Sequence, residues 1–241
     1  MNYEQYKKKI KNNFERTTAI YDKYATVQTD IFNKMLNELK QTIIPQGVYA
    51  DYGCGTCTNT QQLTDIISPI HAIDLIKNPL KNLTDDIIYQ QTDFDKTLFQ
   101  NNSVALLFSN MALHWSSDFS YLINIIYQSL CDNGLLYFSI PIDGMFKEIN
   151  HLHRNDFIKL PELLSQLTTM GFYDIKHSVF EYVLHYESAH AALSAIKNTG
   201  ANTVIKNKKQ GLNKNITAFN NVDNISLTYK IVLISARKHH E

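Results

Sequence analysis

The chain has 241 residues, of which 44% are hydrophobic and 19% charged, and its 23 lysines and arginines balance 23 aspartates and glutamates. This length and composition are typical of one globular domain and exclude an intrinsically disordered chain. The balanced charge gives no indication of a nucleic-acid partner, and apolar runs such as Leu135–Ile140 are too short to span a membrane.

The N-terminus and the cysteines indicate the compartment. The first residues carry charge with no apolar stretch behind them, so no secretory signal is predicted. Cys54, Cys57 and Cys131 are an odd number in a chain that is long enough to fold without disulfides. We therefore expect reduced thiols and a cytoplasmic protein.

The first forty residues are predicted to be helical, because apolar side chains recur there at spacings of three and four. Pro45 and Gly47 interrupt this pattern, and short apolar runs then alternate with helical stretches. Strands that alternate with helices indicate βαβ units, and hence a parallel sheet with helices on both faces. The predicted elements are strands over Val48–Asp51, Ile70–Asp74, Ile87–Gln90, Val104–Ser109 and Leu135–Ile140, with helices over Asn59–Ile67 and Phe119–Leu130.

The C-terminal part follows another pattern. A helix over Pro161–Met170 ends at Gly171, and the alternation over Tyr173–Tyr186 predicts a long strand. A helix over Ser188–Asn198 and a strand over Ser226–Ala236 follow. We expect the two last strands to form an antiparallel hairpin added to the parallel sheet.

These elements predict a single α/β domain over residues 1–241, with a mostly parallel seven-stranded sheet. No internal repeat and no second domain boundary is visible in the sequence. Residues 1–40 are expected to form a helical lid outside the sheet. Residues 143–172 begin without a clean periodicity, and we expect them to cap the sheet.

The strongest local signal is a glycine turn after the first predicted strand. Asp51 ends that strand, and Gly53 and Gly55 lead the chain into a helix. Glycines at such a turn let the backbone approach a ligand closely. Asp74 ends the next strand, where a carboxylate can accept hydrogen bonds from both ribose hydroxyls of a nucleoside. This combination predicts a nucleoside cofactor.

Two other interpretations of the turn are weaker. A dinucleotide site would need a third glycine at the position of Thr58, beside the pyrophosphate. The nucleoside cofactor that fits better is S-adenosylmethionine, a methyl donor. It has no phosphate, and its amino group and sulfonium suit the acid at Asp51. Cys54 and Cys57 form a Cys-x-x-Cys pair, but no second pair exists to complete a zinc site, so we interpret them as small turn residues.

Candidate site residues also follow the third and fourth strands. In open α/β sheets, ligands bind at the carboxyl ends of the strands, near the point where the strand order reverses. Asn110, His114 and Trp115 follow the fourth strand and are therefore expected near the methyl donor. Asp93 follows the third strand and is placed to meet the adenine edge, although a loop acid or a helix cap is an equally good interpretation.

Motifs spread over nearly the whole chain resemble those of a known family. They are Phe14-x-Arg16-x-x-Ala19-x-Tyr21 with Ala25 and Gln28, Ser109-Asn110-x-Ala112-Leu113-x-Trp115, His153-x-Asn155-x-Phe157, Ile196-Lys197-x-x-Gly200-Ala201 and Leu227-Thr228-Tyr229. With these residues the chain resembles the malonyl-[acyl-carrier protein] O-methyltransferases of biotin synthesis, which are Rossmann-like class I methyltransferases. It departs from that family at Cys57, where glycine is common, at Cys131–Gly134, which replaces Arg-Pro-Gly-Gly, and at His114, where glutamine is common.

The resemblance implies transfer of a methyl group from S-adenosylmethionine to the carboxylate of a malonyl thioester on acyl carrier protein. The alternatives are a small free acid such as aconitate, or a non-catalytic protein with the same fold. The expected cofactor-binding residues are Tyr21, Gln28, Asp51, Gly53, Gly55, Asp74, Leu75, Asp93, Phe94, Asn110, Met111 and Trp115. The expected substrate residues are Arg16, Tyr21, His114, His153, Asn155 and Lys197.

No catalytic base and no metal are expected, because a carboxylate with a pKa of about 4 is already ionised at neutral pH. The work of the protein is then positioning and exclusion of water. For the partner, the polar loop with Lys206, Lys208, Lys209 and Lys214 is expected to meet an acidic acyl carrier protein, since opposed charge speeds encounter. A merely solvated loop is the alternative.

Overall fold

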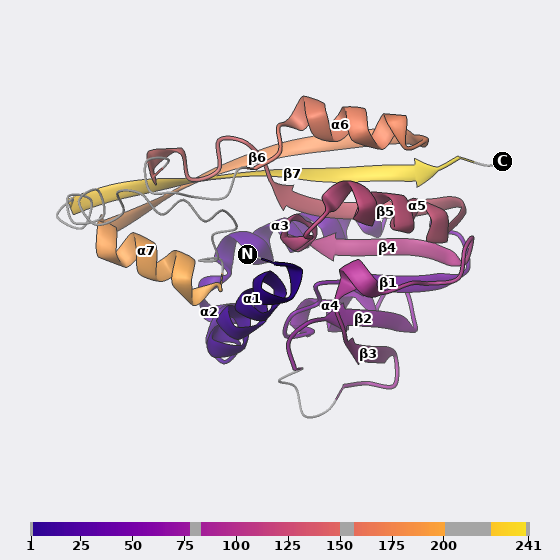
Figure 1. Ribbon diagram of the computed structural model, residues 1–241, viewed down its shortest axis with the longest axis horizontal. Coiled ribbons are helices and arrows are strands. Elements are labelled where there is room, and N and C mark those ends of the chain that lie inside the picture. The colour runs from indigo at the N-terminus through magenta and orange to yellow at the C-terminus, as the bar shows by residue number, and fades with distance from the viewer. Residues whose placement is uncertain (1, 78–82, 150–156, 201–222, 240–241) are drawn as a thin grey trace.

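The computed structural model describes residues 2–77, 83–149, 157–200 and 223–239, and its centre is a seven-stranded sheet (Figure 1). The strand order is β3-β2-β1-β4-β5-β7-β6. Neighbours among β1 to β5 run parallel, and β7 runs antiparallel to both β5 and β6. The strands are β1 Val48–Tyr52, β2 Ile70–Asp74, β3 Ile87–Gln91, β4 Val104–Asn110, β5 Leu130–Pro141, β6 Phe172–Ser188 and β7 Asp223–Lys238.

Seven helices accompany this sheet in the described part of the chain. Short 3₁₀ turns follow β3, β4 and β5 at Phe94–Lys96, Leu113–Trp115 and Lys147–Ile149. Helix termini are fixed locally: Asn2 and Gln5 form a reciprocal capping box at the start of α1. The helices are α1 Tyr3–Thr17, α2 Tyr21–Tyr24, α3 Thr26–Leu39, α4 Thr58–Leu63, α5 Phe119–Ser129, α6 Leu160–Thr169 and α7 Ala189–Asn198.

Two apolar clusters, one on each face of the sheet, hold these layers together. One contains buried residues of α1, α5 and α6, and the other contains buried residues of α3, α4 and α7. The strands between them, such as Val104–Phe108 of β4, are almost completely buried, which explains their continuous apolar sequence. The predicted α/β fold, with helices on both faces and a C-terminal antiparallel hairpin, is confirmed.

The lid expected over residues 1–40 and the cap expected over residues 143–172 each include a helix that packs on the sheet instead. Within residues 1–40, only α1 and α2 lie over the ends of the strands, whereas α3 packs on the sheet with Ile31, Phe32 and Met35 inaccessible to solvent. Within residues 143–172, α6 also packs on the sheet, through Leu163 and Leu167. Periodicity alone did not separate a helix that covers a site from one that covers the core, because both bury one apolar face.

Candidate active site

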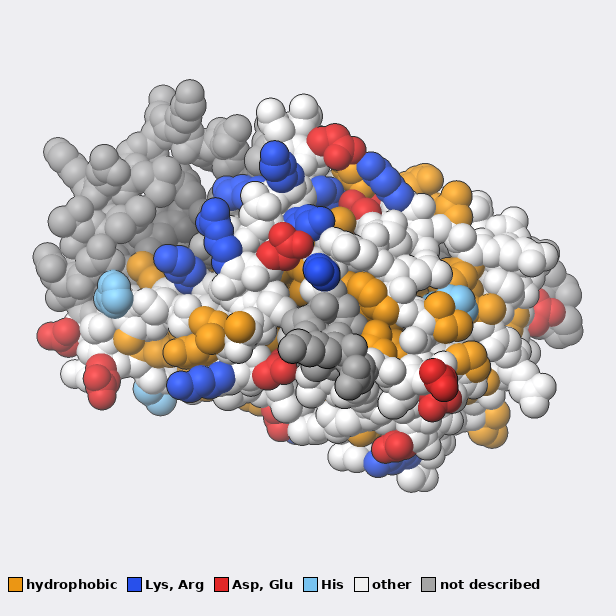
Figure 2. Space-filling model, turned by 90° about the horizontal axis from the view of Figure 1, so that it is seen from below, with side chains coloured by type: hydrophobic (Ala, Val, Ile, Leu, Met, Phe, Trp, Pro, Cys, Tyr) orange, Lys and Arg blue, Asp and Glu red, His pale blue; other side chains and the backbone are white. Residues whose placement is uncertain are grey.

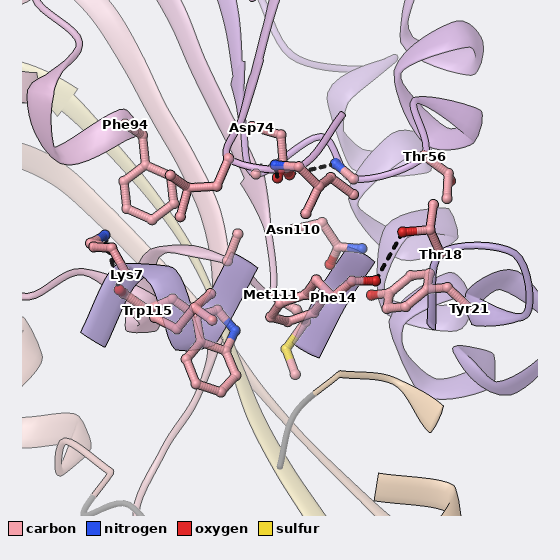
Figure 3. Close-up of a pocket in the computed structure, with 16 residues that line it drawn as sticks. Lys7, Phe14, Thr18, Tyr21, Thr56, Asp74, Phe94, Asn110, Met111 and Trp115 are labelled. Atoms are coloured by element: carbon pink, nitrogen blue, oxygen red, sulfur yellow. Dashed lines mark hydrogen bonds between the residues drawn. The ribbon is translucent and has the colours of Figure 1, made fainter. Parts of the chain in front are cut away.

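The strand order reverses between β1 and β4, which are hydrogen-bonded neighbours in the middle of the sheet. A cavity lies at the carboxyl ends of these two strands, roofed by α1 and by Tyr21 of α2 (Figure 3). Figure 3 shows Asp74 on one side of it, and Met111 and Trp115 on the other. This location is the one expected from the topology, and we call this cavity the cofactor pocket.

The glycine turn forms one wall of the cofactor pocket. Gly53 and Gly55 have φ angles of +76° and +56°. A Cβ on Gly53 would lie 2.1 Å from the Cβ of Ala112, so no larger residue fits there without a shift of the backbone. A Cβ on Gly55 would meet nothing within 4 Å, so the backbone at this residue is left open. Cys57 has a φ of +60°, which explains why glycine is common at this position of the turn.

Asp74 joins the second strand to this turn. Its carboxylate accepts hydrogen bonds from the backbone N–H groups of Gly55 and Ile76, at 2.8 and 3.0 Å. Burial raises the pKa of Asp74, and the backbone hydrogen bonds oppose this rise. Each carboxylate oxygen has two lone pairs, so both oxygens keep an acceptor site for a hydroxyl of a ligand.

Asp51 is the second acid of the site and lines an adjoining cavity together with Gln28 and Gly53. Only 3% of its surface is exposed, and among the described residues its carboxylate accepts one hydrogen bond, from the Thr60 hydroxyl at 2.7 Å. Burial raises the pKa of Asp51 to about 7, and a cation bound beside it would favour the ionised form.

The residues of the cofactor pocket fit S-adenosylmethionine. Asp74 keeps free acceptor sites of the kind that ribose hydroxyls need, and Asp51, in the adjoining cavity, has no cationic partner among the described residues. Leu75, Phe94 and Met111 give the cavity apolar walls, which suit an adenosyl group. Asn110 plays a positioning part, because its amide N–H donates to the carbonyl of Gln28 at 2.9 Å and its oxygen accepts from Ser139 at 2.8 Å.

Asp93, which was expected at the adenine edge, does not line the cofactor pocket. Its carboxylate accepts hydrogen bonds from the Tyr3 hydroxyl at 2.6 Å and from Lys7 at 3.0 Å. Lys7 is 4% exposed and also pairs with Asp95 at 2.9 Å. The structure therefore engages Asp93 in holding α1 on the domain. Sequence reasoning missed Lys7, because nothing distinguishes it from its neighbours Lys8 and Lys9 except a tertiary contact.

A second cavity borders the cofactor pocket, and the two share Phe14, Tyr21, Met111 and Trp115. We call it the acceptor pocket. His114 lines it, as do Gln28 and a series of aromatic side chains. The other expected substrate residues are placed differently. Arg16 and Lys197 are exposed and line neither pocket, and His153 and Asn155 lie outside the described residues.

Comparisons with known proteins agree with this architecture. A methyltransferase domain family matches residues 50–138, which run from β1 into β5 and include the glycine turn. Malonyl-[acyl-carrier protein] O-methyltransferase 2 of Coxiella burnetii is 30% identical over 240 residues, which cover 96% of each chain. This chain belongs to the malonyl-[acyl-carrier protein] O-methyltransferase family. A relative from Alcanivorax borkumensis, with the same name, is 26% identical over 95% of this chain and 86% of its own length.

Solved structures share the fold at lower identity. The 1,6-didemethyltoxoflavin-N1-methyltransferase of Burkholderia thailandensis, solved with S-adenosylhomocysteine, has a TM-score of 0.61 and 14% identity, and the match covers 100% of this chain and 92% of that one. Phosphoethanolamine N-methyltransferase 2 of Haemonchus contortus, also with S-adenosylhomocysteine, has a TM-score of 0.61 and 16% identity, over 96% of this chain and 61% of that one. The family and the fold together make this chain an S-adenosylmethionine-dependent methyltransferase.

No helix of the described residues is long and apolar enough to cross a membrane. No group of three or more His, Cys, Asp or Glu side chains in the same residues could hold a metal ion.

Proposed function

We propose that this methyltransferase methylates the free carboxylate of a malonyl thioester carried by acyl carrier protein, an early step of biotin synthesis. The names of its relatives support this substrate. The observation that carries the proposal is the pair of adjoining pockets, which share Phe14, Tyr21, Met111 and Trp115 under one helical roof. Such a pair can hold a methyl donor and an acceptor side by side.

The cofactor site in this proposal consists of residues that line the cofactor pocket and the adjoining cavity beside Asp51, at the ends of β1, β2 and β4. Asp74 accepts the ribose hydroxyls, and Asp51 lies toward the cationic end of the donor. When bound, S-adenosylmethionine supplies an electrophilic methyl group on a sulfonium. The remaining residues shape and close the site, and they are Tyr21, Gln28, Gly53, Gly55, Leu75, Phe94, Asn110, Met111 and Trp115.

The protein contributes positioning and exclusion of water rather than proton transfer. A malonyl carboxylate is ionised at neutral pH, so the acceptor needs no general base. Phe14, Trp115 and Phe157 give the acceptor pocket apolar surfaces that hold the carboxylate away from water. Removing water from a charged nucleophile and fixing its approach are recognised contributions to such reactions.

The partner in this proposal is an acidic acyl carrier protein that reaches the site from the side of α1 and α2. The loop lysines expected to meet it, Lys206, Lys208, Lys209 and Lys214, lie outside the described residues. Within the described chain, Lys8, Lys9 and Arg16 of α1 are exposed, and Figure 2 shows lysine and arginine side chains gathered over this region. We place the reaction in the cytoplasm, where the free thiols of Cys54 and Cys57 would stay reduced.

A methyl-transfer assay with competing acceptors tests the substrate class. Malonyl-loaded carrier, a short malonyl thioester, malonate and aconitate are offered at equal concentration with labelled S-adenosylmethionine. We expect the carrier to be methylated fastest, the short thioester more slowly, and the free acids least. Preferential methylation of aconitate or malonate would replace this proposal by a free-acid methyltransferase.

A further inference from the structure

His114 is a polar side chain in the acceptor pocket whose hydrogen-bonding capacity is not used. It lies in the 3₁₀ turn Leu113–Trp115 that follows β4, and its ring lines the acceptor pocket. The ring centroid is 4.9 Å from that of Trp115 and 6.5 Å from that of Phe157. Its Nδ1 atom is buried and has no hydrogen-bond partner among the described residues. Buried polar atoms are nearly always paired, so an unpaired one calls for an explanation.

The described lining of the acceptor pocket carries no formal charge at neutral pH. None of its described lining residues is a lysine, arginine, aspartate or glutamate. Burial lowers the pKa of His114 to about 3, so the ring is neutral at physiological pH. A neutral imidazole carries one N–H donor and one acceptor nitrogen. An anionic acceptor in this pocket would therefore be bound by neutral donors and not by a basic side chain.

We propose that His114 is the residue that positions the acceptor carboxylate: when the acceptor binds, the imidazole ring turns so that its unpaired Nδ1–H donates a hydrogen bond to a carboxylate oxygen. The inference rests on the proposed function and names the residue that selects a carboxylated acyl group. A carboxylate only accepts hydrogen bonds, so its binding selects the tautomer with the proton on Nδ1. If the bound acyl group has no carboxylate, Nδ1 of His114 stays buried and unpaired. The pocket therefore rejects acyl groups that lack a carboxylate.

Glutamine, which is common at this position in the family that the sequence resembles, also has an N–H donor at the end of its side chain. Leucine has similar bulk and no donor. The variants His114→Gln and His114→Leu therefore separate hydrogen bonding from packing. His177→Leu is the matched control, because His177 is exposed on β6 and lines none of the cavities described above.

The test is a binding measurement with two short thioesters, malonyl-pantetheine and acetyl-pantetheine, which differ only in the carboxylate. Each is titrated calorimetrically into protein saturated with S-adenosylhomocysteine, so that no turnover occurs. We expect the wild-type protein and His177→Leu to prefer the malonyl thioester. We expect His114→Leu to lose about ten- to hundredfold of this preference, and His114→Gln to keep most of it.

A second measurement uses only the wild-type protein, so it does not depend on the folding of a variant. Nitrogen-15 spectra of the histidine rings should show Nδ1 of His114 becoming protonated and hydrogen-bonded when the malonyl thioester is added, and not with the acetyl thioester. A folded His114→Leu variant that retains the malonyl preference, or that weakens both thioesters equally, would overturn the inference. Failure of the wild-type protein to methylate or bind any malonyl thioester would instead overturn the proposed function, and this inference with it.

Discussion

At the scale of single residues, the site is built around two acids, of which Asp51 is buried and Asp74 is partly buried. Asp74 is held by two backbone N–H groups, whereas Asp51 has only the Thr60 hydroxyl among the described residues. Burial raises the pKa of both carboxyls. The two acids therefore predict different responses to mutation and to pH.

Replacing Asp74 by Ala is expected to weaken S-adenosylmethionine binding by about 1–3 kcal/mol, because hydrogen bonds to a charged acceptor are lost. The backbone N–H groups of Gly55 and Ile76 also lose their partner, so the melting temperature should fall as well. Calorimetric titration of a variant shown by circular dichroism to be folded measures the first effect. Unchanged affinity would remove Asp74 from the cofactor site.

Asp51 is expected to make cofactor binding depend on pH. Its pKa is about 7 in the folded protein, so below that pH a proton competes with the cationic end of the cofactor. Affinity should therefore weaken as the pH falls below about 7, by up to about tenfold for each pH unit. In the cofactor-free protein, the raised pKa means that this residue's contribution to stability decreases as the pH rises from about 4 to about 7.

The variant Asp51→Asn checks both parts of this prediction. It should bind the cofactor more weakly at pH 8 and should show a flatter dependence of affinity on pH than the wild-type protein. Titration calorimetry between pH 5.5 and 8, about the span over which the acid changes charge, provides the comparison. Parallel pH profiles for the two proteins would show that Asp51 does not face the cofactor.

At the scale of secondary-structure elements, α1 is the part whose attachment decides whether the cofactor pocket is closed. Lys7 anchors α1 through buried ion pairs with Asp93 and Asp95. Asp93 caps the 3₁₀ turn that follows β3, and Asp95 lies within this turn. Ile10 and Phe14 on the same helix line the cofactor pocket. Loosening of the helix should therefore reach the cofactor.

The variant Lys7→Met tests this attachment. Removing one partner of a buried ion pair leaves the other charges uncompensated and typically costs about 3–5 kcal/mol. We expect faster amide hydrogen exchange over Tyr3–Thr17 and weaker S-adenosylmethionine binding. Lys8→Met is the matched control, because Lys8 is exposed on the same helix. Equal exchange in the two variants would show that the buried pairs do not hold α1.

The sequence predicted the elements well wherever the signal was local. The run Val104–Ser109 was expected as a strand and forms most of β4, and the turn at Gly53 and Gly55 was expected from the glycines and the strand that precedes them. Tertiary choices were not readable in the same way. The attachment of Asp93 to Lys7 and the unpaired nitrogen of His114 depend on which side chains the fold brings together, and neither leaves a periodic pattern.

At the scale of the whole molecule, the strand order places the site at the reversal point between β1 and β4, and the hairpin β6–β7 at one edge of the sheet. The cofactor pocket lies where β1 and β4 meet, and α1, α2 and α7 lie on the side to which the arrows of β4 and β5 point (Figure 1). A bulky carrier must approach from this side to deliver its thioester. The charge of this side should therefore affect the carrier and not the small ligands.

Reversing Lys206, Lys208 and Lys209 to Glu is expected to raise the KM for the malonyl carrier, because surface charge mainly speeds encounter and fades with salt. Cofactor binding and methylation of a short malonyl thioester should stay as in the wild-type protein. Steady-state assays at low and high salt give the comparison. Equal turnover of the carrier by the triple variant at low salt would exclude this loop as the docking surface.

The most direct test of the central claim is the intact mass of the carrier after one round of reaction. Malonyl-loaded and acetyl-loaded acyl carrier proteins are each incubated with the enzyme and S-adenosylmethionine, and their masses are measured. We predict that the malonyl carrier gains the mass of one methylene group, that cleavage of the thioester by mild alkali releases this gain together with the acyl group, and that the acetyl carrier is unchanged. A malonyl carrier that keeps its mass, or a gain shared by both carriers, would contradict carboxyl methylation of a malonyl thioester.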